Sequence, residues 1–434
     1  MFINPFIFGS PVSPTNLHGR RRELRRLVSR LLQQGQSSAL VGEPRSGKTS
    51  LLHYLMATET RANLYGAQNE KIYFSYFDAL TLGAQFSPAQ FWARAIEPLH
   101  HLGTDRESPL GAALHTCEHE NYSNFSLERF FACLQDSGLL LTLLLDEFDA
   151  LVELPAFQQA EFYGGLRALT SRFASLALVI SSRQSLAALN RRTQEFSRNG
   201  SPFFNIMEEI FLGPLTEKEC HELLSCAGGR FSAKDHRFLL STSGGHPYLL
   251  QASASALWET YEDDEDAPSS SRWKKTLEAL HAQAAPTLSD TWRLWSPEMK
   301  KALTIIALDG LPQLLGEKHF DIPSLLADLP NYNPELRELK RRGFIQDDAA
   351  GCWSVTAGVL YLWLADEWIS ALRKQDDLVN WLGNQGLDGG LFTPGERKQL
   401  SAAAKGLGPV LKSGLAVFIN AAAEGFGKGI TGAK

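Results

Sequence analysis

The sequence has few cysteines, and they form no pattern that would bind a metal or build a disulfide framework. The chain of 434 residues contains five of them and no C-x-x-C pair: Cys117, Cys133, Cys220, Cys226 and Cys352. An odd and scattered set is typical of reduced thiols in the cytosol. We therefore expect a cytoplasmic protein whose fold needs neither disulfides nor zinc.

Long apolar runs and a strong positive charge are also missing. No apolar run approaches the roughly 18 residues that a membrane-spanning helix needs, and residues 1–6 lack the basic start and apolar core of a signal peptide. The net charge of −6 argues against a nucleic-acid surface over the whole chain but leaves room for a local basic patch. The composition, 44% hydrophobic and 21% charged, is ordinary for roughly two to four globular domains.

What the sequence does contain is a phosphate-binding loop. Residues 42–49 follow the pattern G-x-x-x-x-G-K-T, between an expected buried strand at 38–41 and an expected helix from Ser50. The glycines let backbone N–H groups turn toward phosphates, and the helix N-terminus adds its positive dipole end. Lys48 would contact the β- and γ-phosphates, and the Thr49 hydroxyl would reach Mg²⁺. The flanking elements disfavour the alternative, a chance glycine-rich turn. The expected nucleotide-binding residues are Gly42, Glu43, Pro44, Arg45, Ser46, Gly47, Lys48, Thr49 and Ser50.

A second phosphate-site signature follows a strongly apolar segment. Residues 139–145 are almost pure hydrocarbon, as in a central parallel strand buried on both faces, and Asp146 and Glu147 come directly after them. Asp146 would hold Mg²⁺ through water, and Glu147 would act as the general base on the attacking water. The alternative is a buried strand that ends in a polar turn.

Two arginines are further candidates at this site. Residues 174–183 form another apolar strand with a polar tip, and such tips line the ligand crevice of open α/β sheets. Arg183, or a serine beside it, would sense the γ-phosphate as a catalytic residue; an ordinary surface arginine is the alternative. Arg20 would pack near the base or phosphates, or lie on the solvated face of a helix whose apolar stripe is Leu24, Leu27, Leu31 and Leu32.

A small helical domain is predicted after the last strand of the sheet, which we place at 210–215. Thr216 and Glu219 form a capping box that opens its first helix. His246 and Pro247 begin another helix, with Pro247 in the first turn. His246 would reach the nucleotide, or act as a capping or packing residue. The acidic and then Pro/Ser-rich segment 262–271 is interpreted as a solvated linker.

A winged helix is predicted next. Helices at 299–306, 322–329 and 336–343, the last stopped by Gly343, precede two short strands at 344–348 and 352–356. The basic cluster of this domain, Arg337, Lys340, Arg341 and Arg342, lies where such a fold can touch DNA. Because the surroundings are not basic, we favour the alternative that the domain packs against the nucleotide-binding domain.

The last segment has a different composition, with seven glycines at Gly406, Gly408, Gly414, Gly425, Gly427, Gly429 and Gly432. Leu407, Leu411, Leu415, Phe418 and Ala422 recur at helical spacing. From Arg397 onward six basic residues face one acidic residue, a balance of 6 − 1 = +5. This tail suits an anionic membrane surface or a partner's groove, which would make the protein peripheral to a membrane. The alternative is a helix docked on its own protein and followed by a frayed end.

These motifs, in this order, resemble the archaeal-ATPase-like AAA family within the STAND class of P-loop signal-transducing ATPases. The resemblance covers residues 1–370 and rests on Asn4-Pro5-Phe6, Gly19-Arg20, the phosphate loop, Leu145–Asp149, Ser182-Arg183, Phe203-Phe204-Asn205, Gly213-Pro214-Leu215 and Gly244–Leu249. It implies ATP or ADP and Mg²⁺ as cofactors, an ADP-held closed state and an ATP-driven state that oligomerises. It also implies nucleotide contacts at Lys48 and Thr49, a catalytic and metal pair at Asp146 and Glu147, a sensor at Arg183, and a lid contact at His246 and Pro247.

The predicted architecture is therefore an α/β P-loop ATPase with a parallel sheet at 1–214, a helical lid at 215–262, a winged helix at 272–372 and a helical tail at 373–434. The predicted function is a slow ATPase switch in bacterial signalling or defence, with the tail as output. No repeat array follows the winged helix, unlike in many relatives, so the sensor or effector must lie in the tail, the lid, the winged helix or another protein. The alternative is a DNA-binding ATPase regulator that acts through its winged helix.

Overall fold

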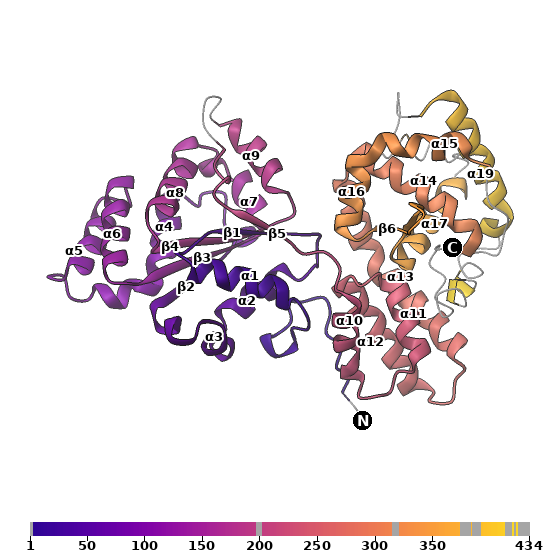
Figure 1. Ribbon diagram of the computed structural model, residues 1–434, viewed down its shortest axis with the longest axis horizontal. Helices are drawn as coiled ribbons and strands as arrows, with labels where there is room; N and C mark the ends of the chain where they lie inside the picture. Colours follow the sequence, from indigo (N-terminus) through magenta and orange to yellow (C-terminus); the bar gives the residue numbers. More distant parts are fainter. Residues whose placement is uncertain are drawn as a thin grey trace. The chain divides into compact units, whose positions relative to one another are not determined.

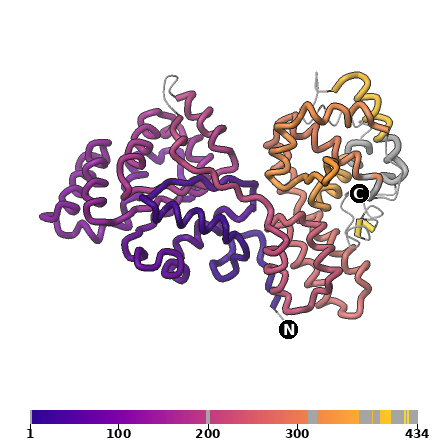
Figure 2. The backbone as a smooth tube through the Cα atoms, viewed as in Figure 1, coloured from indigo at the N-terminus to yellow at the C-terminus, as the bar shows by residue number. Residues whose placement is uncertain are grey.

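The computed structural model describes residues 3–196, 202–314, 321–373, 383, 392–412, 419–420 and 422–423 (Figures 1 and 2). The chain forms two compact units. The sheet unit comprises Pro11–Glu43 and Gly47–Leu212, and the helical unit comprises Met1–Ser10, Pro44–Ser46 and Gly213–Lys434.

The sheet unit is built on five parallel strands in the order β2-β3-β4-β1-β5. Their bounds are β1 Ser38–Val41, β2 Ile72–Asp78, β3 Leu140–Asp146, β4 Leu176–Ser182 and β5 Glu208–Phe211. The predicted parallel α/β fold is confirmed. The last strand lies earlier than the predicted 210–215, because its ladder with β1 pairs Ser38 with Glu208 and ends at Phe211.

Helices cover both faces of this sheet (Figure 1). They are α1 Arg21–Leu32, α2 Lys48–Met56, α3 Thr58–Tyr65, α4 Pro88–Ile96, α5 Pro109–His119, α6 Asn124–Asp136, α7 Phe148–Glu153, α8 Ala160–Arg172 and α9 Leu186–Gln194. Strand β3 has the predicted burial on both faces: Leu143 and Leu145 join the core that contains Phe91, while Leu144 joins the core that contains Leu51. Alternation along a strand sends successive side chains to opposite layers, so an all-apolar strand fits this three-layered unit.

The apolar stripe of α1 is narrower than predicted. Leu27 and Leu31 are buried and Leu24 is half-buried, but Leu32 is 42% exposed. Five residues correspond to about 140° of rotation around a helix, which turns Leu32 away from the face that carries Leu27.

The helical unit contains most of the remaining helices and a two-stranded antiparallel sheet. Its elements are α10 Glu217–Leu224, α11 Ala233–Ser243, α12 Pro247–Asp263, α13 Ser269–Leu294, α14 Pro297–Leu314, α15 Pro323–Asp328, α16 Asn333–Arg342, β6 Ile345–Asp347, β7 Trp353–Val355, α17 Gly358–Arg373 and α19 Pro394–Lys412. The capping box of Thr216 and Glu219 is confirmed. Gly343 ends α16 at φ 83°, a left-handed conformation that favours glycine.

The predicted linker at 262–271 is wrong in its length. Helix α12 continues to Asp263 and α13 already begins at Ser269. From the first turn of α13, the buried Arg272 guanidinium donates hydrogen bonds to the carbonyl oxygens of Asp264 and Glu265. A buried charge needs such partners, so the acidic segment is a short turn held by a basic side chain.

Three helices and a hairpin, α14 to β7, follow one another in the predicted order. Their identification as a winged helix, like the domain boundaries proposed from the sequence, remains a prediction. In the described part of the tail, Phe392, Leu400, Ala403, Ile419, Ala422 and Ala423 are buried in the core of the helical unit. The predictions for Leu415, Phe418 and the glycines from Gly414 onward lie outside the described residues, and for Leu407 and Leu411 only the helical backbone is described. Within the described ranges, none of the helices is both long and apolar enough to cross a membrane.

Candidate nucleotide-binding site

The phosphate-binding loop joins the end of β1 to the start of α2, as its pattern predicts. Gly47 has φ 94° at the N-cap of α2, so the loop makes its final turn in a conformation that glycine tolerates best. The Nζ atom of Lys48 donates to the carbonyl oxygens of Gly42 and Glu43, at 3.0 Å each. Lys48 is 4% exposed, so its ammonium group is fixed inside the loop by backbone carbonyls.

Burial controls the charge of Lys48. Loss of hydration lowers the pKa of its ammonium group, and the Arg183 charge lowers it further. The carboxylates of Glu147, Glu43 and Asp146 oppose that shift but do not cancel it. A positive charge held in this place would be stabilised by phosphate oxygens, which carry the opposite charge.

Asp146 stands at the end of β3 with both carboxylate oxygens hydrogen-bonded. Its Oδ1 atom accepts from the Ser181 hydroxyl and from the Glu147 N–H, the latter at 3.1 Å. Its Oδ2 atom accepts from the Tyr76 hydroxyl at 3.0 Å. Burial raises the pKa of Tyr76, and the Asp146 charge raises it further, so this hydroxyl stays a donor. Asp146 is 2% exposed. Its carboxylate is held by Tyr76 from β2 and by Ser181 from β4.

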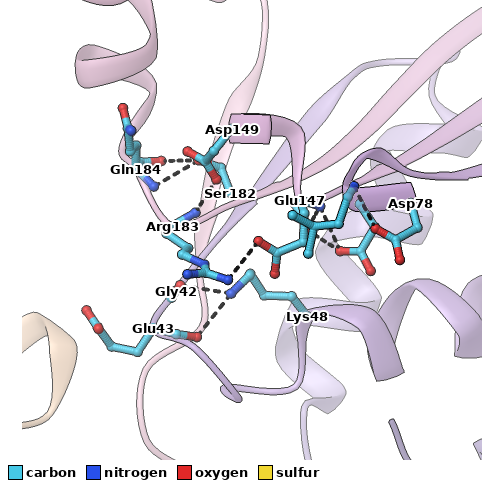
Figure 3. A network of polar contacts seen from close by, with 12 residues as sticks. Gly42, Glu43, Lys48, Asp78, Glu147, Asp149, Ser182, Arg183 and Gln184 are labelled. Carbon is cyan, nitrogen blue, oxygen red and sulfur yellow. Dashed lines mark hydrogen bonds and ion pairs between the residues drawn. The ribbon is translucent and has the colours of Figure 1, made fainter. Parts of the chain in front are cut away.

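Glu147 and Arg183 form an ion pair between the ends of β3 and β4. The Glu147 Oε2 atom lies 3.2 Å from Nη2 of Arg183 (Figure 3). Glu147 has φ 48°, a conformation that is uncommon for a residue with a side chain. On the other side, Asp149 accepts hydrogen bonds from the Ser182 hydroxyl and the Arg183 N–H, each at 2.9 Å. The two strand ends are thus joined by carboxylates from the segment after β3.

Figure 3 shows Lys48, Glu147 and Arg183 side by side, and the Asp146 charge also acts on Lys48, so the structure brings together four residues that the sequence predicted separately. Thr49 lies half-buried in the first turn of α2. The Ser50 hydroxyl accepts a hydrogen bond from the N–H of Val12 at 3.1 Å, so this side chain also fixes the segment before α1. The roles of these residues toward a nucleotide remain predictions.

Arg20 does not lie on a solvated helix face. It is 4% exposed, has φ 60° and forms the N-cap of α1, with a guanidinium nitrogen 3.9 Å from the carboxylate of Glu23. The next two residues, Arg21 and Arg22, are exposed instead. A contact between Arg20 and the nucleotide remains a prediction.

Other predicted contacts belong to the helical unit. His246 is the residue before α12, and Pro247 occupies the first turn of that helix as predicted. Arg45, Pro44 and Ser46 are grouped with this unit as well, and within it the Arg45 guanidinium lies 4.4 Å from the centre of the Tyr248 ring. A contact of His246 or Pro247 with a nucleotide remains a prediction.

Sequence reasoning missed Tyr76, Ser181 and Asp149. Tyr76 gave no signal, because one tyrosine in an aromatic strand is indistinguishable from a core residue. Ser181 and Ser182 stood beside Arg183 in the polar tip, and Asp149 belonged to the acidic run after β3. Their roles depend on which strands become neighbours, and β3 pairs with both β2 and β4.

Three of the four basic residues in the cluster on α16 are paired with carboxylates. Arg341 and Arg342 both pair with Glu338, at 2.9 Å and 2.7 Å, and Lys340 pairs with Asp347. Burial alone would raise the pKa of the Glu338 carboxyl, but Arg341 and Arg342 hold it below its usual range. Charges already paired with carboxylates are poor phosphate ligands, which weakens the DNA-binding alternative.

A family model described as Novel STAND NTPase 2 matches residues 107–269, well under half of the chain. The match includes Asp146, Glu147 and Arg183 and leaves the phosphate-binding loop outside. The predicted STAND-class resemblance is confirmed. The match and the P-loop fold support the predicted ATPase activity of this STAND-like chain.

A solved Walker-type ATPase of Pyrococcus abyssi shares this fold, with a TM-score of 0.50 and 16% identity over 83% of this chain and 99% of that one. Two other solved structures are less similar, and the fold assignment does not rest on them. One is a STAND protein with a tetratricopeptide-repeat sensor from Pyrococcus horikoshii, with a TM-score of 0.34, 15% identity, and coverage of 88% of this chain and 50% of that one. The other is a Cdc6 protein from Pyrobaculum aerophilum, with a TM-score of 0.40, 16% identity, and coverage of 80% and 93%. No curated protein sequence matches the chain.

Proposed function

We propose that this chain is an ATP-dependent switch that binds and slowly hydrolyses ATP and changes its assembly with nucleotide state. The observation that carries the proposal is the convergence of Lys48, Asp146, Glu147 and Arg183 at the carboxyl ends of neighbouring strands. Ligands of open α/β sheets bind at this edge. A bacterial signalling or defence role, with the tail as output, is the finer form of the proposal.

The residues present fit a nucleotide with Mg²⁺. The Lys48 ammonium sits among loop carbonyls at a helix N-terminus, where anions are favoured. Thr49 and Asp146 offer hydroxyl and carboxylate oxygens, the ligands that Mg²⁺ prefers. Bound there, Mg²⁺ would neutralise developing charge on the phosphates.

The Glu147–Arg183 ion pair suggests how this chain would couple binding to catalysis. Glu147 is the carboxylate placed to take a proton from water, but its Oε2 atom is 3.2 Å from the Arg183 guanidinium. Arg183 would exchange this partner for a terminal phosphate and so release Glu147. The general base would then become available only when the site holds a triphosphate.

The tail would carry the output of the switch. Its described part is packed into the helical unit through Phe392, Leu400 and Ala403, so a partner or an anionic membrane would have to compete with this packing. We propose that oligomerisation in the ATP state favours that release. The implied partners are a second copy of this chain and the surface that receives the tail.

The decisive experiment is the mass of the protein in solution with ADP and with a non-hydrolysable ATP analogue. Wild type, Lys48→Ala and Lys71→Ala are compared, the last being an exposed lysine outside the loop. An ATP-dependent oligomer in wild type and Lys71→Ala, but not in Lys48→Ala, supports the switch. One mass in every condition contradicts it. Duplex binding at low salt, where phosphate contacts are strongest, would instead favour the DNA-binding alternative.

A further inference from the structure

We propose that Tyr76 is a positioning residue for the magnesium site, because it fixes the orientation of the Asp146 carboxylate through a hydrogen bond from its hydroxyl. The inference rests on the proposed nucleotide-binding function and adds a residue that no motif identifies. Tyr76 lies on β2, a strand outside both phosphate-site motifs.

The hydrogen bonds of Asp146 show why Tyr76 matters. A carboxylate offers about four acceptor positions, two on each oxygen. Among the described residues, Oδ1 accepts from Ser181 and from the Glu147 N–H, while Oδ2 accepts from Tyr76 at 3.0 Å. The acceptor position that stays available to a metal-bound water is therefore on Oδ2, and the Tyr76 hydroxyl decides where it points.

The ring of Tyr76 is itself fixed by the helix that follows the phosphate-binding loop. The His53 and Tyr76 rings meet edge to face, with centroids 5.2 Å apart and an interplanar angle of 62°. His53 comes four residues after Thr49 on α2, and this spacing places both on one helix face. Tyr76 thus contacts the helix that carries Thr49, the predicted Mg²⁺ ligand, and hydrogen-bonds to Asp146, which would hold the ion through water.

Hydrogen-bond partners of metal-binding groups orient those groups, and losing such a partner typically lowers metal affinity about 10- to 100-fold. The strand register explains how Tyr76 reaches Asp146. It pairs with Leu144 on β3, two residues before Asp146, so its hydroxyl reaches along the strand to the carboxylate. Removing only the hydroxyl leaves the ring, and hence the contact with His53, in place.

The test is binding of a fluorescent ADP analogue to full-length protein, titrated with Mg²⁺ after treatment with EDTA. Tyr76→Phe removes the hydroxyl, and Tyr73→Phe on the same strand is the matched control, since its ring lies beside His101 instead. Asp146→Asn is the reference for loss of the metal ligand. Each protein yields two quantities: affinity without Mg²⁺, and the Mg²⁺ concentration that gives half of the gain in affinity.

We expect Tyr76→Phe to raise the half-maximal Mg²⁺ concentration about tenfold, with the EDTA affinity unchanged and Tyr73→Phe equal to wild type. An unchanged Mg²⁺ dependence in Tyr76→Phe overturns the inference and leaves the proposed function standing. Equal weakening with and without Mg²⁺ also overturns it, because that pattern indicates a structural role alone. If wild type fails to bind the analogue in either condition, the proposed function fails and the inference falls with it.

Discussion

The carboxylate of Glu147 lies 3.2 Å from the guanidinium group of Arg183. The two residues directly follow the neighbouring parallel strands β3 and β4, and each is also held by its backbone: the Glu147 N–H donates to Ser181 and the Arg183 N–H donates to Asp149. The candidate base and the candidate sensor are therefore one unit in this conformation. This pairing is the basis of the first two predictions.

Glu147→Gln is expected to lower ATP turnover by about 10²- to 10⁴-fold, the usual contribution of a general base, while ATP binding is kept. The amide has the shape of the carboxylate but cannot accept a proton from water. Phosphate release and nucleotide affinity are measured on the same sample. Glu153→Gln, at the end of the adjacent helix α7, is the control and should turn over normally. Normal turnover in Glu147→Gln would remove Glu147 from the mechanism.

Arg183→Gln is expected to reduce the preference for ATP over ADP, because the side chain that senses the terminal phosphate is lost. Affinity for ADP should change by less than about twofold, since ADP lacks the group that Arg183 would contact. The ratio of the two dissociation constants is the measurement. Arg192→Gln is the matched control, because Arg192 pairs with Glu153 elsewhere on the sheet unit. An unchanged ratio in Arg183→Gln would make Arg183 a structural partner of Glu147 only.

Lys48→Met is expected to abolish nucleotide binding without lowering the stability of the nucleotide-free protein near neutral pH. Burial lowers the pKa of Lys48, so the charged form costs stability in the folded state. Between the lowered folded pKa and the ordinary value, the unfolded chain binds more protons, and the stability of wild type rises with pH. The stability of wild type relative to Lys48→Met should therefore increase toward alkaline pH. Melting temperatures of both proteins from pH 7 to 10 check this, and a difference that falls with pH would contradict it.

Lys301 is expected to hold the start of the tail helix α19 on the helical unit. Its ammonium group is 1% exposed and lies 2.6 Å from Asp328 and 3.3 Å from Glu396. Burial alone would lower the pKa of Lys301, but these hydrogen-bonded partners raise it overall. The ion pairs of Lys301 therefore contribute fully to stability below the ordinary lysine pKa. This contribution is lost as pH rises through the raised pKa of Lys301 in the folded protein.

Lys301→Met is expected to destabilise the protein by about 3 kcal/mol, because it leaves a carboxylate buried without its partner. Adding Glu396→Gln should recover part of the loss. Denaturant unfolding of the two variants and wild type provides the comparison. Lys300→Met is the neighbouring control, because burial lowers the pKa of Lys300, whereas ion pairing raises that of Lys301. Equal stability of Lys301→Met and wild type would show that the ion pair does not anchor α19.

Much of the site could be predicted from the sequence because its motifs are local. The phosphate-binding loop is one continuous segment, and its spacing of glycines, Lys48 and Thr49 is what a strand-to-helix turn around phosphate requires. Asp146 and Glu147 directly follow an apolar run whose composition already indicates an inner parallel strand. The same holds for the capping box at Thr216 and Glu219, whose partners are three residues apart.

Predictions based on average composition were weaker. The acidic segment at 262–271 was interpreted as a linker, but Arg272 binds the carbonyl oxygens of Asp264 and Glu265 and closes a tight turn. Leu32 was counted in an apolar stripe, although its angular position turns it to solvent. In both cases the composition of the segment was a poorer guide than one specific contact or one position around a helix.

The P-loop fold class could be predicted from the sequence, because the residues predicted to bind phosphate are contiguous and the burial of each strand follows from its own composition. Which side chains act together depends on how the chain folds. Tyr76 meets Asp146 across 70 residues, Ser181 meets it across 35, and Lys301 meets Glu396 across 95. Such contacts depend on the strand order β2-β3-β4-β1-β5 and on helix packing, because hydrogen bonds and ion pairs form only between groups that the folded chain brings within about 3 to 4 Å.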